Sequence, residues 1–281
     1  MLPDLTLKEL DRYSRQIMLP GFGEEGQRKL KASTALVTGV GGLGGTAALY
    51  LAVAGIGKLI LVRGGDLRQD DMNRQILMTD DWVGKPRVDK AKATLAAINP
   101  ELQIEAVCEY VTPENVEALV AQSDIALDCA HNFDERNLLN TACVQQGIPM
   151  IEAAMNSMEA YLTTIIPGET PCLSCLFPEK PDWDRRGFGV LGVVSGTLAC
   201  MTALEAIKVI TGYGEALRSQ LLTMDLNRME FAKRRPYKDP DCPVCGSSAQ
   251  PTQTPVGLDL SQVQHQWDAC ALAEPLPLVT R

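Results

Sequence analysis

Short apolar runs alternate with longer amphipathic stretches along the first half of the chain. Residues 34–37 are an apolar run that predicts a strand, and residues 58–62 are another. Between them, the Ala- and Leu-rich residues 43–54 predict a helix that ends at Gly55, because glycine readily adopts the left-handed conformation of a helix C-cap. Strand, helix and strand in this order predict a right-handed βαβ unit.

The alternation continues to about residue 155. Further helices are predicted at 84–98, at 113–121 with Thr112 as the N-cap, and at 133–146, and further strands at 103–107, 124–129 and 149–153. Beyond this point three strand patterns, with a long helix from Val190 between them, lie at 160–166, 220–225 and 228–234. We therefore predict an α/β fold with a Rossmann-like, mostly parallel sheet, helices on both faces and a C-terminal antiparallel strand region.

Four segments follow from these patterns. Residues 1–32 form an N-terminal helical segment, and residues 33–155 form a Rossmann-like, nucleotide-binding part. Residues 156–246 add the antiparallel sheet and the long helix to the same domain. Residues 247–281 are rich in Pro, Gln and Thr, which predicts a flexible tail. A chain of 281 residues that is 46% hydrophobic can bury the core of one such extended domain.

Charge and hydropathy exclude several classes of function. The net charge is −9 and the 26 Lys and Arg residues are scattered, so the sequence lacks a basic patch and we expect no nucleic-acid partner. Charged residues near the N-terminus stand where a secretory signal has its apolar run, which indicates the cytoplasm. The longest apolar stretch, residues 190–210, contains Ser, Thr, Glu and Lys, so it predicts a buried helix and no membrane span.

A glycine-rich loop lies between the first predicted strand and the first predicted helix. Its glycines are Gly39, Gly41, Gly42 and Gly44. Without side chains the backbone can approach a phosphate closely, and the N-terminus of the following helix attracts negative charge. This context favours binding of a nucleotide's phosphates, and a purely structural tight turn is the alternative.

Two CxxC pairs, Cys172 with Cys175 and Cys242 with Cys245, provide four thiol ligands. Four thiolates match the tetrahedral coordination of Zn²⁺, and a site with four Cys ligands has no open position for catalysis. We therefore predict a structural zinc site that joins two remote segments. Four unligated thiols, or a redox CxxC pair, are the alternatives. Nine cysteines in total, an odd number, argue against a disulfide framework in a reducing compartment.

Several motifs occur in the order seen in one known family. They are Arg12-Tyr-Ser-Arg-Gln16, the glycine loop, Asn73-Arg-Gln75, Gly84-Lys-Pro-Arg87, Asp128-Cys129 with Asn132 and Arg136, Gly189-Val-Leu-Gly192, Ala203-Leu-Glu-Ala-Ile-Lys208 and the two CxxC pairs. With these motifs, about residues 8–246 resemble the ThiF/MoeB/HesA family. The resemblance implies binding of ATP and Mg²⁺, adenylation of the C-terminal glycine carboxylate of a small, ubiquitin-like sulfur-carrier protein, and a homodimer.

The resemblance also implies roles for individual residues. Arg74 and Arg87 would stabilise the charge of the triphosphate, with Asn73 and Gln75 nearby, and Arg15 would reach the site from a neighbouring subunit, like an arginine finger. Adenylation needs such cations while the carboxylate attacks the α-phosphorus. For any one of these arginines alone, an ordinary surface cation is the alternative.

Three residues near the expected nucleotide depart from the family's usual pattern. Arg63 stands where the family has an Asp that binds the ribose hydroxyls, and Arg has only hydrogen-bond donors, so Asp66 would have to compensate. Asp71 replaces an Asn and adds a negative charge close to the phosphates, which is unfavourable unless a cation sits there. Arg87 replaces a Lys and keeps its positive charge.

Two further departures concern the metal and the covalent chemistry. His131 takes the place of the carboxylate expected to hold Mg²⁺, an ion that prefers oxygen ligands, so Asp128 or Asp134 would have to supply them. Arg185 lies where some members carry a cysteine, so a thioester or persulfide step through that position is not available.

Three functions are compatible with these residues. The first is an adenylyltransferase that works with substituted residues. The second is a catalytically impaired relative that acts as a binding or scaffold subunit, in a homodimer or in a heterodimer with an active homologue. The third is a dinucleotide-binding protein, because an Arg at the end of the second strand is typical of sites for the 2′-phosphate of NADP. The sequence identifies neither the carrier protein nor its pathway.

Overall fold

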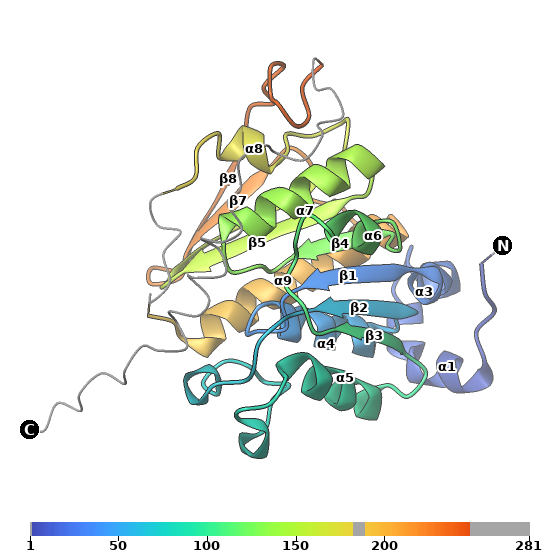
Figure 1. Ribbon diagram of the computed structural model, residues 1–281. Helices are drawn as coiled ribbons and strands as arrows, with labels where there is room; N and C mark the ends of the chain where they lie inside the picture. The colour runs from blue at the N-terminus through green and yellow to red at the C-terminus, as the bar shows by residue number, and fades with distance from the viewer. Residues whose placement is uncertain (1, 182–188, 248–281) are drawn as a thin grey trace, which may run out of the picture. The chain divides into compact units, whose positions relative to one another are not determined.

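The computed structural model describes residues 2–181 and 189–247 (Figure 1). The predicted tail, beyond Ser247, and the departure at Arg185 lie outside the described residues. All other candidate site residues lie within the described ranges, and the elements that carry them belong to or pack against one eight-stranded sheet.

The strands of this sheet lie in the order β3-β2-β1-β4-β5-β6-β7-β8. Their bounds are β1 Thr34–Thr38, β2 Lys58–Val62, β3 Gln103–Val107, β4 Ile125–Asp128, β5 Met150–Asn156, β6 Glu159–Ile165, β7 Leu221–Asp225 and β8 Glu230–Arg234. The strands from β3 to β5 pair in parallel, whereas those from β5 to β8 pair antiparallel. The predicted fold class, a Rossmann-like parallel sheet extended by C-terminal antiparallel strands, is confirmed.

The helices follow the strands in the predicted alternation. Their bounds are α1 Leu7–Arg12, α2 Ser14–Ile17, α3 Gly23–Ala32, α4 Gly44–Ala54, α5 Arg87–Ile98, α6 Val116–Val120, α7 Phe133–Gln146, α8 Leu173–Leu176 and α9 Gly192–Thr211. Two short 3₁₀ helices, η1 Gln69–Asp71 and η2 Asp80–Trp82, lie in the connection from β2 to α5. In Figure 1, α6 and α7 cover one face of the sheet, and α4, α5 and α9 lie on the other.

Alternate side chains of the parallel strands enter different cores. In β1, Ala35 and Val37 are buried in the core that includes α4, α5 and α9, whereas Leu36 is buried in the core that includes α6 and α7. A strand that is covered on both faces needs apolar side chains at every position. This is why the parallel strands are continuous apolar runs in the sequence.

α9 is the one described helix that is long and apolar enough to cross a membrane. It packs against α4 and β5, and its Leu198, Ala199 and Ala203 side chains are buried in the core. Core helices pass the same test of length and hydropathy, so that test alone is weak evidence for a membrane span. The helix begins at Gly192 rather than at the predicted Val190.

Two other predicted helix starts are wrong. α5 begins at Arg87 rather than Gly84, because the φ of Gly84 is +82°, a left-handed conformation that a right-handed helix does not contain. α6 begins after Asn115, whose side chain accepts a hydrogen bond from the backbone amide of Thr112 at 2.9 Å. Thr112 therefore belongs to a turn before α6 and is not its N-cap.

The strand order reverses between β1 and β4. Chain connections lead from β1 outward to β2 and β3 on one side, and from β4 to β5 on the other. In open α/β sheets such a reversal leaves a crevice at the carboxyl ends of the two strands, where ligands bind. The glycine loop follows β1, and the turn that starts at Asp128 follows β4, so both border this crevice.

Candidate nucleotide and metal sites

The glycine loop lies between β1 and the first residue of α4. Gly39 has a φ of +104°, and a Cβ atom there would lie 2.6 Å from the carbonyl oxygen of Cys129. Gly44 packs against the backbone of Gly39 with no room for a side chain. At Gly41, by contrast, the nearest atom to such a Cβ is Nε2 of Gln75, at 3.9 Å. Gly39 and Gly44 are therefore needed for the turn, whereas Gly41 leaves a bare stretch of backbone that a ligand can approach.

Gln75 borders this bare stretch. Its side chain is only 4% exposed, and among the described residues its Oε1 atom has no hydrogen-bond partner. Leaving a buried acceptor without a donor costs about 1–3 kcal/mol, and native proteins rarely do so. A bound molecule with a hydrogen-bond donor would satisfy this oxygen.

The start of α9 closes the loop from another side. Ser195 Oγ would lie 2.6 Å from a Cβ atom on Gly42, and the Cβ of Arg74 would lie 3.2 Å from it. Gly192 packs against the backbone of Asn73 and Arg74 with no space for a side chain. Sequence analysis missed Ser195, although a hydroxyl in the first turn of an apolar helix, directly after a glycine motif, is a usable signal.

A cluster of charges joins Arg74 and Arg87 through one carboxylate. Asp71 Oδ1 lies 2.9 Å from Nη2 of Arg74, and Asp71 Oδ2 lies 3.1 Å from Nη1 of Arg87. Arg87 also donates hydrogen bonds to the carbonyl oxygens of Gly65 and Asp66. The sequence predicts that Asp71 is unfavourable unless a cation accompanies it, and the structure provides two.

Arg63 follows β2 and forms part of the wall of the crevice. Its side chain is buried, and the guanidinium carbon lies 5.1 Å from the centre of the Tyr110 ring. The same ring packs against Gly64. Burial raises the pKa of Glu135, and the positive charge of Arg63 opposes that rise. The side chain of Asp66, by contrast, is exposed, while its carbonyl group accepts the bond from Arg87.

Asp128, at the end of β4, belongs to a buried network. Its Oδ1 accepts a hydrogen bond from the amide of Ala130 at 3.0 Å, and its Oδ2 lies 3.5 Å from Nη1 of Arg136. The same guanidinium lies 2.7 Å from Oε1 of Glu152, which also accepts a bond from the Tyr161 hydroxyl at 2.8 Å. Burial and the charge of Asp128 raise the pKa of Glu152. Sequence analysis missed Glu152, although a carboxylate inside an apolar strand signals a buried partner.

The residues expected to hold Mg²⁺ do not assemble a magnesium site. Asp128 is wholly buried beside Arg136, the side chain of His131 is exposed, and Asp134 lies 3.1 Å from the Lys180 ammonium. Within residues 2–181 and 189–247, the cysteines form the only group of three or more potential metal ligands. Mg²⁺ is usually held by one or two carboxylates, with waters and phosphate oxygens completing its octahedral shell. The two candidate carboxylates already lie beside the cations of Arg136 and Lys180, so they do not fit Mg²⁺ as they stand.

The four cysteines of the two CxxC pairs do come together. Their Sγ atoms all lie within 4.8 Å of one another, with 3.7 Å between Cys172 and Cys242 and 3.4 Å between Cys175 and Cys245. Zinc–sulfur bonds of about 2.3 Å imply tetrahedral edges of about 3.8 Å, so four thiolates here fit a metal ion of that size. Burial raises the pKa of Cys172 to about 11, so an arriving cation would have to release protons.

Arg15 lies on α2, at the far end of α4 from the glycine loop. Its neighbour Gln16 donates a hydrogen bond from Nε2 to the carbonyl oxygen of Ala54, the last residue of α4, at 3.0 Å. α4 has 11 residues and is therefore about 16 Å long. The exposed Arg15 side chain is too far away to reach the loop of its own subunit.

Comparisons with known proteins agree with this picture. The model of the ThiF family matches residues 13–244. The chain is 74% identical over 246 residues to Protein HesA, heterocyst, of Trichormus variabilis, which covers 88% of this chain and 92% of that protein. It is 41% identical over 278 residues to the SAMP-activating enzyme E1 of Haloferax volcanii, which covers 97% of this chain and 99% of that protein.

A solved structure shows the same fold. The crystal structure of E. coli MccB with ATP matches 84% of this chain and 74% of its own chain, with a TM-score of 0.75 and 26% sequence identity. Motifs, fold and overall identity thus lead to one conclusion. The chain belongs to the ThiF family.

Proposed function

We propose that this protein binds ATP at the glycine loop and adenylates the C-terminal glycine of a small, ubiquitin-like sulfur-carrier protein. The observation that carries this proposal is the bare backbone at Gly41, at the switch point of the sheet, with the buried Gln75 side chain beside it. The Nε2 atom of Gln75 lies nearest to Gly41, and its Oε1 atom has no hydrogen-bond partner among the described residues. Relatives add support. The SAMP-activating enzyme E1 is an activating enzyme of similar length, and MccB has been solved with ATP.

The reaction joins a carboxylate to the nucleotide. An oxygen of the carrier's glycine carboxylate attacks the α-phosphorus, the bond from that phosphorus to the oxygen bridging it to the β-phosphorus breaks, and pyrophosphate leaves. The amides of the glycine loop and the guanidinium of Arg74 stabilise the negative charge on the phosphates. Asn73 Oδ1 accepts a hydrogen bond from Arg74 at 2.9 Å and so orients it.

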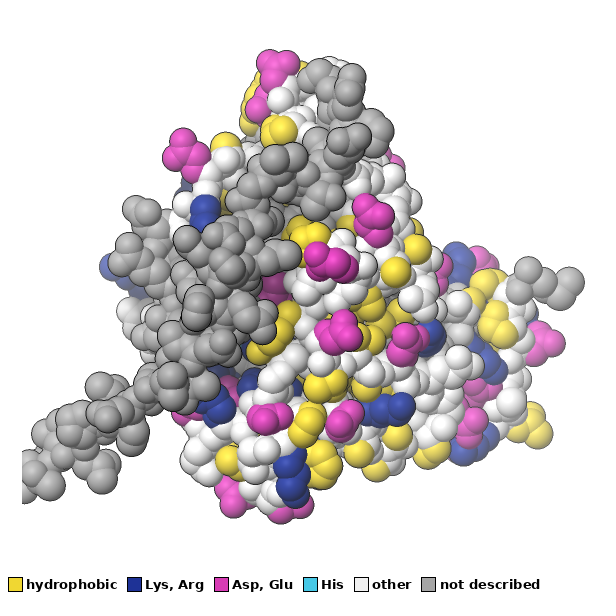
Figure 2. Space-filling view, in the orientation of Figure 1, with side chains coloured by type: hydrophobic (Ala, Val, Ile, Leu, Met, Phe, Trp, Pro, Cys, Tyr) yellow, Lys and Arg dark blue, Asp and Glu magenta, His cyan; other side chains and the backbone are white. Residues whose placement is uncertain are grey.

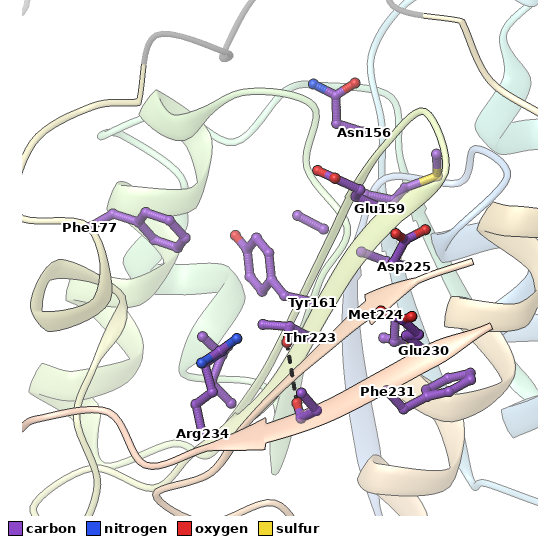
Figure 3. A pocket seen from close by; sticks show the side chains of 15 residues that line it. Asn156, Glu159, Tyr161, Phe177, Thr223, Met224, Asp225, Glu230, Phe231 and Arg234 are labelled. Atoms are coloured by element: carbon purple, nitrogen blue, oxygen red, sulfur yellow. Dashed lines mark hydrogen bonds between the residues drawn. The ribbon is translucent and has the colours of Figure 1, made fainter. Parts of the chain in front are cut away.

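We place the carrier protein on the antiparallel half of the sheet. A hollow of about 1000 Å³ lies over β5 to β8, and Tyr161, Phe177, Phe231 and Arg234 are among its lining residues (Figure 3). Aromatic surface beside charged groups suits a protein partner. Tyr161 also donates to Glu152, whose partner Arg136 contacts Asp128 at the crevice, so the hollow and the crevice share one buried network.

Oligomeric state and location complete the proposal. Because Arg15 cannot reach the loop of its own subunit, it contacts the nucleotide that is bound by the second copy in a homodimer.

Zn²⁺ is held by Cys172, Cys175, Cys242 and Cys245 and stabilises the fold without taking part in the reaction. The protein works in the cytoplasm. Figure 2 shows acidic and basic side chains interspersed on the face in view, which agrees with a protein partner rather than a nucleic acid.

The test is ATP–pyrophosphate exchange with Mg²⁺ and candidate glycine-terminated carrier proteins. We expect exchange by the natural protein that depends on the carrier. An Arg63→Asp/His131→Asp double variant, which restores the family's usual carboxylates, is run beside it. Silence from the natural protein, with exchange by the folded double variant, would reject the proposal and show that these two positions disable the chemistry.

A catalytically impaired binding or scaffold subunit is the second candidate. Two observations favour it: Asp71 already occupies both arginines expected on the phosphates, and the side chains around Asp128 do not fit Mg²⁺. Such a subunit would form a homodimer, or a heterodimer in which it lends Arg15 to an active homologue. The NADP alternative has less support, because Arg63 would have to leave its buried place over Tyr110 to bind a 2′-phosphate.

A further inference from the structure

One carboxylate, that of Asp71, holds two arginines at the edge of the crevice. Each of its oxygens faces a different guanidinium, Arg74 at 2.9 Å and Arg87 at 3.1 Å. A phosphate group binds arginines through paired oxygens in the same way. Asp71 therefore occupies the donors that an incoming phosphate would use.

The two arginines differ in how firmly they are held. The Arg87 side chain is 8% exposed and makes further bonds to the carbonyl oxygens of Gly65 and Asp66, so it is fixed in its place. The Arg74 side chain is 25% exposed, and its other contacts are with Asn73 and the carbonyl oxygen of Asp70. Separating a buried ion pair is strongly unfavourable, whereas a partly exposed pair exchanges partners at low cost. Arg74 is thus the arginine that can turn to a ligand.

Arg74 also borders the glycine loop. A Cβ atom on Gly42 would lie 3.2 Å from the Cβ of Arg74. An anion on the loop amides is therefore within a side-chain length of the Arg74 guanidinium. The negative charge of Asp71, 2.9 Å from the Arg74 guanidinium, would repel that anion and attract Arg74.

We propose that Asp71 is a built-in counter-ion that competes with the phosphates of a nucleotide for Arg74 and so lowers the affinity of the site for polyphosphates. The proposal rests on the proposed function in one respect, since it takes the glycine loop as the phosphate site. It also explains two departures from the family's pattern together. Asp71 and Arg87 form an ion pair with each other, at the two positions where the family usually has an Asn and a Lys.

The experiment measures the binding of inorganic tripolyphosphate by calorimetry, in the absence of any carrier protein. Asp71→Asn removes the negative charge that competes for Arg74, so the affinity for tripolyphosphate should rise about tenfold. Asp70→Asn is the matched control. Asp70 is exposed and pairs with Arg68. Its substitution changes the net charge by the same amount, one residue away, so the variant's affinity for tripolyphosphate should stay within about twofold of that of the natural protein.

Asp71→Asn leaves Arg87 buried without its carboxylate, so a second variant guards against a failure to fold. Asp71→Asn/Arg87→Lys restores the family's usual pair and should also bind tripolyphosphate about tenfold more tightly than the natural protein. Thermal melting identifies the folded variants. The proposal is overturned if the folded variants that carry Asp71→Asn bind tripolyphosphate no more tightly than Asp70→Asn, or if none of the proteins binds it.

This outcome is separable from the fate of the proposed function. Tighter binding of tripolyphosphate by Asp71→Asn, without pyrophosphate exchange by any variant, would support the counter-ion and reject adenylation. Exchange by the natural protein, with no gain in affinity from Asp71→Asn, would support adenylation and reject the counter-ion.

Discussion

The cysteine cluster and the nucleotide crevice are built in opposite ways. Each joins segments that are remote in sequence, and each is where a divalent metal is expected, Zn²⁺ from the spacing of the cysteines and Mg²⁺ from the family resemblance. In the cluster all four ligands are of one kind, and their Sγ atoms lie within 4.8 Å of one another. In the crevice the carboxylates are bound by arginines, Asp71 by Arg74 and Arg87, and Asp128 by Arg136. A cluster of four thiols is suited to binding a metal ion, whereas carboxylates that already pair with arginines are not.

The largest effect should come from breaking the cysteine cluster. Cys242→Ser should remove the bound metal and cost more than about 5 kcal/mol in the free energy of unfolding, because a structural zinc site contributes its binding energy to folding. Metal content per chain and denaturant unfolding measure both. Cys200→Ser, which alters an exposed cysteine on α9, is the control and should change neither. A Cys242→Ser protein that keeps its metal would contradict the assignment.

The charge network of the crevice should be the next most sensitive. Arg136→Met leaves Asp128 and Glu152 buried without a cation, which should cost about 3–5 kcal/mol in the free energy of unfolding. Adding Glu152→Gln to this variant removes one of the two stranded carboxylates and should recover part of the loss. Urea unfolding of Arg136→Met, Glu152→Gln and the double variant tests this. A loss in the double variant equal to the sum of the two single losses would show that the two side chains are not coupled.

The pH dependence of stability separates the crevice from the cluster further. The pKa of Glu152 in the folded protein is raised above its ordinary value of 4.5, so the native state keeps a proton that the unfolded chain releases. Stability should therefore fall as the pH rises above 4.5, until the pH passes the folded pKa. Glu152→Gln has no such proton, so its stability relative to the natural protein should improve from pH 5 to pH 8. A constant difference between the two proteins would reject the raised pKa.

The smallest effect on stability, with a selective effect on binding, is expected in the glycine loop. Gly41→Ala places a methyl group where the nearest atom is 3.9 Å away, so the free energy of unfolding should change by less than about 1 kcal/mol. The methyl group nevertheless blocks the approach to the backbone, and ATP affinity should fall roughly tenfold. Calorimetric titration with ATP is the measurement. Unchanged affinity would mean that the phosphates bind elsewhere. Gly44→Ala is the contrasting variant: there is no room for a methyl group at Gly44, so this substitution should unfold the protein.

Local patterns predicted most of the fold. The parallel strands are visible as apolar runs because both of their faces are covered, and Gly55 ends α4 in the predicted left-handed conformation, at a φ of +91°. Helix starts were less predictable. The turn before α6 depends on the Asn115 side chain, and a search for N-caps by residue type selects the hydroxyl of Thr112 instead.

The sequence by itself determined the order of elements, the fold class, the family and the two CxxC pairs, because these depend on short periodicities and on residue types at fixed spacing. Tertiary structure decided what each charged residue near the crevice does. From the sequence alone Asp71 is an unfavourable charge, whereas in the folded chain two guanidiniums lie beside it. In the same way Arg136 pairs with both Asp128 and Glu152. The physical reason is that an electrostatic energy depends on distance and burial, which residues far apart along a chain acquire only when it folds.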